Sequence, residues 1–203
     1  MRARSRVAVT VALVLALLCC CGAARAQETS VVFDPAQTTI AFSVDSTLHM
    51  VHGTFHLKNG RMRWDASTGQ ASGEIGVDAA SGESGNDTRD KKMHNEILES
   101  PKYPDILFSP TRVKGAMPQQ GTARVDVDGV LRLHGQDHPM TLTFSVESGK
   151  SGEVRATTHF GVPYTKWGLK NANAFLLRVN DTVQVEIHAV GHIEAAAAPA
   201  SHL

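Results

Sequence analysis

Apolar and polar residues alternate along most of the chain after residue 30. Around residue 40, for example, Ile40, Phe42 and Val44 are separated by small or polar residues. Successive side chains of a β-strand point to opposite faces, so this period of two predicts strands with one apolar face each, and the period of an amphipathic helix is nearly absent. Further runs of this kind lie at residues 51–57, 75–77, 125–133, 140–146, 154–160 and 183–187. The chain is therefore predicted to be mainly β.

Turn-forming residues separate several of these runs. Lys58-Asn59-Gly60, Asp128-Gly129 and residues 148–152 have the composition of short loops, which predicts antiparallel neighbours. Asp128-Gly129 fits equally a bulge within one long strand. About seven or eight amphipathic strands must hide one face, and the pattern allows either a sandwich or a closed barrel.

One short helix is predicted near residues 87–98. Asp87 is placed to cap its first amides, Met93 and Ile97 share one face, and Ser100-Pro101 ends it. A helix this short is unstable alone in water and needs a surface to pack on. The mouth of a barrel would provide that surface.

The first segment has the pattern of a secretory leader. Three arginines precede an apolar run at residues 7–18, and small residues flank the bond between Ala26 and Gln27. We expect a signal peptide at 1–26, a single domain at 27–194 and a disordered tail at 195–203. The alternative is a membrane anchor, but the run is shorter than the roughly 20 residues that span a bilayer. The mature chain is thus expected to be periplasmic or secreted, with no transmembrane segment.

Cleavage near Ala26-Gln27 changes the charge and the cysteine content. The whole chain has 20 basic and 20 acidic residues, and the leader removes four arginines and no acid, which leaves a formal charge of about minus four. A nucleic-acid partner is not expected for such a chain. Cys19, Cys20 and Cys21 all lie in the leader, so the mature domain has no thiol for a disulfide or for catalysis. Lipidation of a leader cysteine is the competing interpretation.

Several motifs resemble those of a known family. Thr88-Arg89-Asp90 leads to Leu98, and Lys102-Tyr103-Pro104 then leads into an apolar run. Together with Gly53-Thr54-Phe55 and His138-Pro139-Met140-Thr141-Leu142, these segments resemble the YceI-like, or polyisoprenoid-binding-protein-like, family. The resemblance covers residues 33–193.

This resemblance implies an exported, lipocalin-like antiparallel β-barrel of about eight strands with the one short helix. Its interior would hold a long apolar molecule such as a polyisoprenoid, a quinone or a fatty acyl chain, and a barrel of this size has room for one slender ligand. Members often carry a histidine after the first strand. Here Ser46 stands near that place and His49 follows, so the role of that histidine is unassigned.

An isoprenoid chain needs a dry lining of aliphatic and aromatic groups. The inward positions of the predicted strands supply candidates, for which an ordinary packed core is the competing interpretation. Small inward residues such as Gly53, Gly129, Ala156 and Ala189 are expected to leave volume for a ligand, although glycine also marks bulges. The candidate ligand-binding residues on strands are Phe42, Phe55, Ile75, Phe108, Val127, Leu131, Leu142, Phe144, Phe160, Phe175 and Val185.

Residues 162–177 have the least strand-like pattern of the second half and are expected to form a loop over one barrel opening. Tyr164 and Trp167 combine an apolar ring with a polar atom, which suits the place where a ligand head group meets water. Both are added to the candidate ligand-binding residues. A packed loop without ligand contact is the alternative.

Ten histidines raise the question of catalysis or metal binding. His52 and His56 share an outward face, as do His188 and His192, but no three-ligand signature and no nucleophile motif is present. We therefore expect a non-enzymatic carrier without catalytic residues, metal or cofactor, either monomer or homodimer, that binds a lipid-like molecule. The alternatives are a metal-dependent envelope enzyme and a ligand-free envelope interaction or stress-response module.

Overall fold

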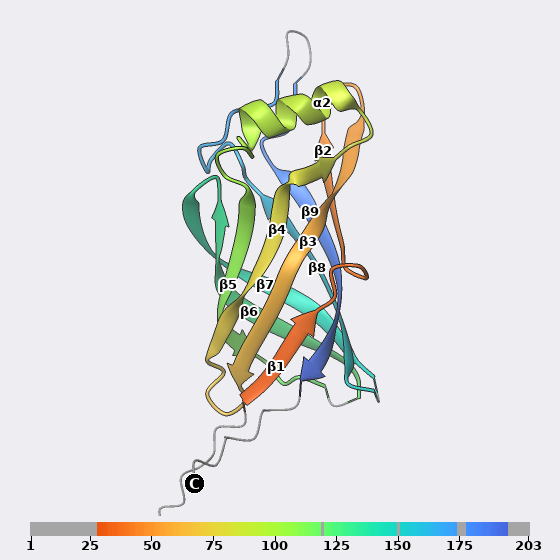
Figure 1. Cartoon of the computed structure of the whole chain (residues 1–203), viewed down its shortest axis with the longest axis vertical. Coiled ribbons are helices and arrows are strands. Elements are labelled where there is room, and N and C mark those ends of the chain that lie inside the picture. Colours follow the sequence, from red (N-terminus) through yellow and green to blue (C-terminus); the bar gives the residue numbers. More distant parts are fainter. Residues whose placement is uncertain (1–27, 119, 150, 174–177, 195–203) are drawn as a thin grey trace, which may run out of the picture.

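The computed structural model describes residues 28–118, 120–149, 151–173 and 178–194. The predicted leader, the predicted tail and Phe175 lie outside the described residues. Within them, nine strands and one short helical segment follow one another along the chain (Figure 1). The elements are β1 (Glu28–Phe33), β2 (Thr39–Asp45), β3 (Met50–Asp65), β4 (Ala71–Glu83), α2 (Asp87–Lys92), η1 (Met93–Ile97), β5 (Asp105–Lys114), β6 (Gly121–Leu133), β7 (Gln136–Ser148), β8 (Glu153–Val162) and β9 (Val183–Glu194).

The strands form one antiparallel sheet that closes on itself. Their order is β1-β3-β2-β9-β8-β7-β6-β5-β4, and two further pairings, β3 with β4 and β1 with β9, complete the ring. Both β1 and β2 lie between β3 and β9, at opposite ends of those strands, so together they fill one position of an eight-membered ring. The predicted antiparallel barrel with one short helix is confirmed, and the sandwich is excluded.

Two turn predictions differ from the structure. Lys58-Asn59-Gly60 lies inside β3, where the pairing with β4 shifts register between Leu57 and Asn59. The extra residue of this bulge explains the turn-like composition, and Gly60 lets the Phe33 ring pack 3.0 Å from where a Cβ would stand. Asp128-Gly129 lies within β6, as the bulge interpretation allowed, opposite a register shift in β5.

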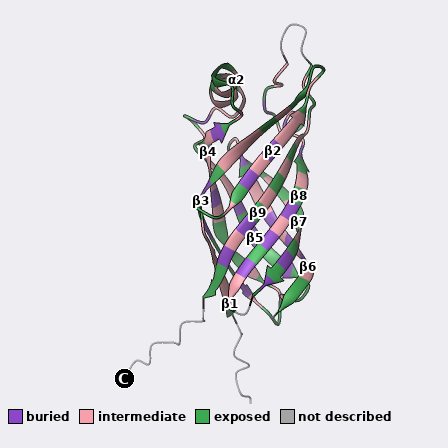
Figure 2. Cartoon of the chain, turned by 90° about the vertical axis from the view of Figure 1, so that its right-hand side faces the viewer, coloured by how far each residue is buried: buried purple, intermediate pink, exposed green. Residues whose placement is uncertain are grey.

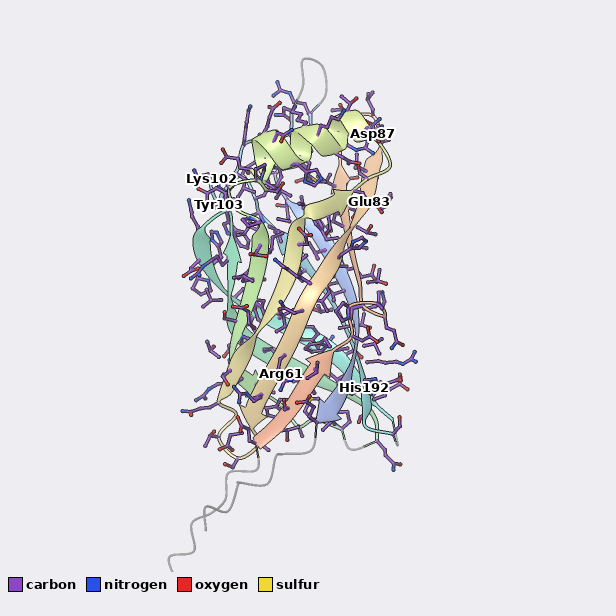
Figure 3. The ribbon with its side chains drawn as sticks, in the orientation of Figure 1. Arg61, Glu83, Asp87, Lys102, Tyr103 and His192 are labelled. Atoms are coloured by element: carbon purple, nitrogen blue, oxygen red, sulfur yellow. The ribbon has the colours of Figure 1, made fainter. Side chains whose placement is uncertain are left out.

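The helical segment covers one end of the barrel, and β1 lies at the other end (Figure 1). Asn86 caps α2, because its side-chain oxygen accepts a hydrogen bond from the Arg89 amide at 3.0 Å. The expected cap at Asp87 is therefore wrong by one residue, and Asp87 is exposed on the helix (Figure 3). No helix of the described residues is long and apolar enough to cross a membrane.

Burial alternates along the strands, as the sequence pattern predicts (Figure 2). The main core cluster lies toward the β1 end and contains Val31, Trp64 and Val125. A second cluster at the helix end contains Leu133, Tyr164 and Leu169, with Ile97 packed against it. Glu28 and Glu194, the first and last described residues, both lie at the β1 end.

Candidate ligand-binding cavity

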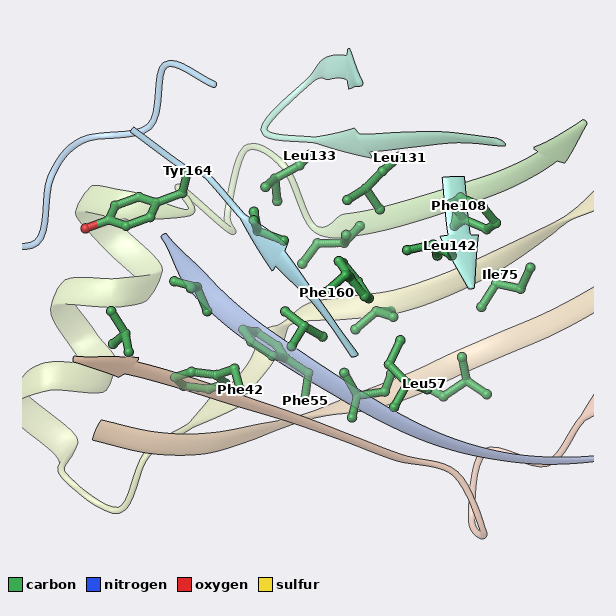
Figure 4. A pocket seen from close by; sticks show the side chains of 18 of the residues that line it. Phe42, Phe55, Leu57, Ile75, Phe108, Leu131, Leu133, Leu142, Phe160 and Tyr164 are labelled. Atoms are coloured by element: carbon green, nitrogen blue, oxygen red, sulfur yellow. The ribbon is translucent and has the colours of Figure 1, made fainter. Parts of the chain in front are cut away.

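A cavity of about 600 Å³ runs inside the ring of strands between the two core clusters. This volume lies within the range of roughly 300–1,000 Å³ that is typical of small-molecule sites. Its walls are the inward side chains of the strands, with aromatic rings and aliphatic groups facing one another across the interior (Figure 4). Each strand contributes every second residue, so the period of two in the sequence becomes a continuous apolar surface.

The structure brings together most of the predicted ligand-binding residues. Trp167 does not line the cavity, and Phe175 lies outside the described residues. Leu57, Met140 and Ile187, which the prediction omitted, line the cavity too. The predicted residues that line it are Phe42, Phe55, Ile75, Phe108, Val127, Leu131, Leu142, Phe144, Phe160, Tyr164 and Val185.

The inward glycines do not create the free volume that we expected from them. A Cβ at Gly53 would meet the Phe42 ring, and a Cβ at Gly129 would meet the Phe108 ring. These glycines therefore give two phenyl rings a place to lie flat against the wall. Ala156 and Ala189, directly paired across β8 and β9, do line the open cavity.

Trp167 has a different neighbour from the one expected. Its ring stacks on His138 at a centroid distance of 4.0 Å and an interplanar angle of 8°. His138 is the cross-strand partner of Leu131 and therefore faces the same side of the sheet. The two stacked rings pack together at the rim of the barrel. Tyr164, in contrast, is almost fully buried, and its ring lines the cavity near α2 (Figure 4).

The end of the cavity beneath the helix has a polar lining. Ser84, Asn86, Arg89 and Lys92 contribute to it from α2 and the turn before it, and none of the described residues that line the cavity is Asp or Glu. The sequence prediction missed the polar end of the cavity, since it looked for ligand-binding residues mainly on the apolar faces of the predicted strands. The helix start at Arg89-Asp90 was visible in the sequence, but its position over the cavity depends on tertiary packing.

Several contacts fix the helical segment above the cavity. Arg89 donates from Nη2 to the Ser84 carbonyl at 2.7 Å, and the Asp90 carboxylate accepts from the Ser84 amide at 3.1 Å. His94 donates from Nε2 to the Gly82 carbonyl at 2.8 Å. Lys170 pairs with Glu96 at 2.8 Å, which ties the segment to the loop after β8. These bonds hold the polar groups in one place over the opening.

Tyr164 presents its hydroxyl group close to this polar end. The hydroxyl oxygen accepts a hydrogen bond from the Ala172 amide at 3.4 Å. Burial raises the pKa of Tyr164 above its ordinary value of 10, so the phenol is protonated at neutral pH. The hydroxyl proton is therefore able to donate to another group.

The histidine pairs that suggested a metal site lie apart from the cavity. His52, His56, His188 and His192 are exposed, and His188 contacts Glu186 at 2.9 Å. Across the described ranges, no group of three or more His, Cys, Asp or Glu side chains is placed to hold a metal ion. His49 lines the cavity mouth together with Ser46, whose hydroxyl donates to the His49 carbonyl at 2.6 Å.

Comparisons with known proteins agree with this architecture. The family model of the YceI-like domain matches residues 32–191. Comparison with curated proteins found no match.

Solved structures share the fold at low sequence identity. The polyisoprenoid binding domain from Saccharophagus degradans, implicated in plant cell wall breakdown, is 15% identical with a TM-score of 0.64, and the match covers 81% of this chain and 98% of that one. BcnA from Burkholderia cenocepacia is 15% identical with a TM-score of 0.63, over 78% and 98% of the two chains. The YCEI protein of Campylobacter jejuni is 17% identical with a TM-score of 0.51, over 66% and 80%.

Proposed function

The chain belongs to the YceI-like family, and on that basis we propose that it is an exported, non-enzymatic carrier of a long apolar or amphiphilic molecule. The ligand would be of the polyisoprenoid, quinone or fatty acyl type and would lie in the barrel interior. The single observation that carries this proposal is the cavity of about 600 Å³ with its aliphatic and aromatic walls.

The physical basis of binding is the removal of an apolar chain from water. Burial of apolar area contributes about 25 cal/mol per Å², or about 0.8 kcal/mol per methylene group. A cavity whose walls are fixed by a closed ring of strands avoids much of the cost of reorganisation on binding. Selection would follow from the length and shape of the ligand, because the walls offer few polar groups along the strands.

Export is part of the proposal and rests on the sequence of residues 1–26. A basic start, an apolar run and small residues before Gln27 are typical of a cleaved leader. The carrier would then act in the periplasm or outside the cell. Edman sequencing or intact mass of the mature protein tests this directly: a chain that begins near Gln27 supports export, and a chain that retains its leader contradicts it.

The first experiment asks whether the barrel holds a lipid. The protein is purified under mild conditions and measured by native mass spectrometry before and after organic extraction. We expect an added mass that disappears on extraction, and extracted protein that binds a fluorescent prenyl alcohol. Protein that is empty as purified and does not bind the probe would contradict the carrier and favour an interaction module.

A matched pair of variants locates the probe inside the barrel. Ala156→Leu projects a larger side chain into the open cavity, whereas His159→Leu adds the same side chain on the outer face of the same strand. We expect Ala156→Leu to weaken probe binding at least about tenfold, a loss of about 1.4 kcal/mol, and His159→Leu to leave it unchanged. Ala156 also packs in the main core cluster, so urea unfolding of both variants is measured to show that each remains folded under the binding conditions. Equal probe affinity in both variants would place the ligand elsewhere.

A further inference from the structure

The polar end of the cavity gathers hydrogen-bond donors at one point. Lys92, half-buried on α2, donates from Nζ to the Ala172 carbonyl at 3.2 Å and to the Asn173 carbonyl at 3.0 Å. An ammonium group has three protons, so one remains for another acceptor. The hydroxyl of Tyr164 lies against the amide of the same Ala172. Lys92 and Tyr164 therefore converge on one residue that itself lines the cavity.

Asn86 adds donors rather than acceptors to this end. Its side-chain oxygen is used as the cap of α2, where it accepts from the Arg89 amide. The two N–H protons of the same amide group are then the part of Asn86 that a ligand can use. A head group bound near Ala172 would thus meet N–H and O–H groups from Lys92 and Tyr164, whereas Asn86 lies six residues before Lys92, at the start of the helix.

The charge of this end is positive. Arg89 and Lys92 line the cavity, and no carboxylate lines it among the residues that the structure describes. Through the described part of the chain, neither of them forms an ion pair, whereas other basic residues such as Lys58, Arg61 and Lys170 do. The Asp90 carboxylate accepts from Ser84 and also feels the charge of Arg89, so Arg89 has an acid nearby, although Asp90 does not line the cavity. The pKa of Glu96 is lowered by its hydrogen bond with Lys170 and also by the charge of Lys92, so Lys92 has an acid nearby. Glu96 does not line the cavity, however, and an anionic ligand inside the cavity would give Lys92 a directly hydrogen-bonded partner.

We propose that the ligand of this cavity has an anionic oxygen head group, a carboxylate or a phosphate, which binds Lys92 and the Tyr164 hydroxyl while its apolar tail fills the barrel. This inference rests on the proposed carrier function and narrows its ligand class. A neutral head group such as a quinone or an alcohol would accept hydrogen bonds but would form no ion pair with Lys92.

The test compares ligands that share a tail and differ in the head group. Palmitic acid, at a pH where it is ionised, and hexadecanol displace the fluorescent prenyl alcohol from extracted protein, and farnesyl phosphate and farnesol do the same in parallel. We expect the anion of at least one pair to bind about tenfold or more tightly than its alcohol. The pair with the larger ratio tells whether the head group is a carboxylate or a phosphate.

Variants of two neighbouring lysines then assign the effect. Lys92→Met should weaken binding of the anion much more than binding of the alcohol, so that the two affinities become similar, whereas Lys92→Arg keeps the preference because it keeps the charge. Lys91→Met is the control, since Lys91 is exposed on the same helix and does not line the cavity. Urea unfolding of each variant shows whether it is folded.

The outcomes separate the head group from the carrier function. Equal binding of acid and alcohol, or an anion preference that survives Lys92→Met, overturns the assignment of the head group while binding of both tails still supports a carrier. Failure of all four ligands and of the probe to bind contradicts the carrier function itself.

Discussion

At the scale of single residues, glycines opposite phenyl rings shape the inner wall of the barrel. Gly53 is the direct cross-strand partner of Phe42, and the Phe42 ring lies over the place where a side chain would begin. Phe55 packs against Phe42 in turn, with ring centroids 5.3 Å apart. The rings therefore line the cavity without crossing it, because the backbone at glycine leaves room beside the wall.

Replacement of Gly53 by alanine tests this arrangement. The new methyl group would meet both the Phe42 ring and the Glu83 carbonyl, and backbone cannot move as easily as a side chain. We expect Gly53→Ala to lower the free energy of unfolding by about 1–3 kcal/mol, measured by urea denaturation. Gly149→Ala is the control, since its nearest neighbour would be 3.9 Å away. A Gly53→Ala protein as stable as the control would show that the ring moves freely aside.

At the scale of elements, the joint between β4 and α2 depends on Ser84. Its amide and hydroxyl groups donate to Asp90, and its carbonyl accepts from Arg89. Burial raises the pKa of Asp90, but the hydrogen bonds from Ser84 and the charge of Arg89 together lower it by more. The pKa of Asp90 is therefore below its ordinary value. Asp90 is thus held as a carboxylate in the folded protein.

This direction fixes the pH dependence of the joint. A carboxyl group whose pKa is lowered in the folded protein binds fewer protons in that state than in the unfolded chain. Its stabilising contribution to the free energy of unfolding is complete above the unfolded-state pKa of about 3.9 and is lost as the pH falls through the folded-state pKa. We expect Asp90→Asn to lower the free energy of unfolding by about 1–2 kcal/mol at neutral pH, and the gap from the unmodified protein to close below about pH 4. Urea titrations across this range measure the gap.

The exposed Asp87 in the same turn gives the comparison. Asp87→Asn should remain close to the unmodified protein throughout the series. A gap for Asp90→Asn that stays constant into acid would mean that the carboxylate charge has no part in holding the joint.

The sequence was sufficient to predict the strands, but it was not sufficient to predict how the strands and the helix are joined. The alternation at Ile40, Phe42 and Val44 identifies an inward face because the pleat imposes it. The cap at Asn86 and the bulge at Asn59 were missed, since asparagine suits turns, caps and bulges alike. In the sequence, Lys92 cannot be distinguished from an ordinary exposed lysine on a helix. Only the packing of α2 over the end of the barrel places it at the cavity.

At the scale of the whole molecule, ligand binding in the cavity is coupled to the stability of the folded barrel. A ligand that binds only the folded barrel stabilises it by an amount that grows with its free concentration. At about one hundred times its dissociation constant, the fluorescent prenyl alcohol should add about 2.7 kcal/mol, which corresponds to a rise in Tm of roughly 5–10 °C for a chain of this length. Differential scanning calorimetry of extracted protein with and without the probe measures the rise. Ala156→Leu should show a smaller rise at the same probe concentration, and an unchanged Tm in the unmodified protein would argue against binding to the folded state.

The pairing of β1 with β9 brings both described ends of the chain to the pole remote from α2. A tag, a fluorescent fusion or a coupling to a bead at either end would therefore leave the helix-covered end of the barrel pointing outward. Any tether at those ends would orient the barrel in the same way, with α2 at the pole farthest from the point of attachment.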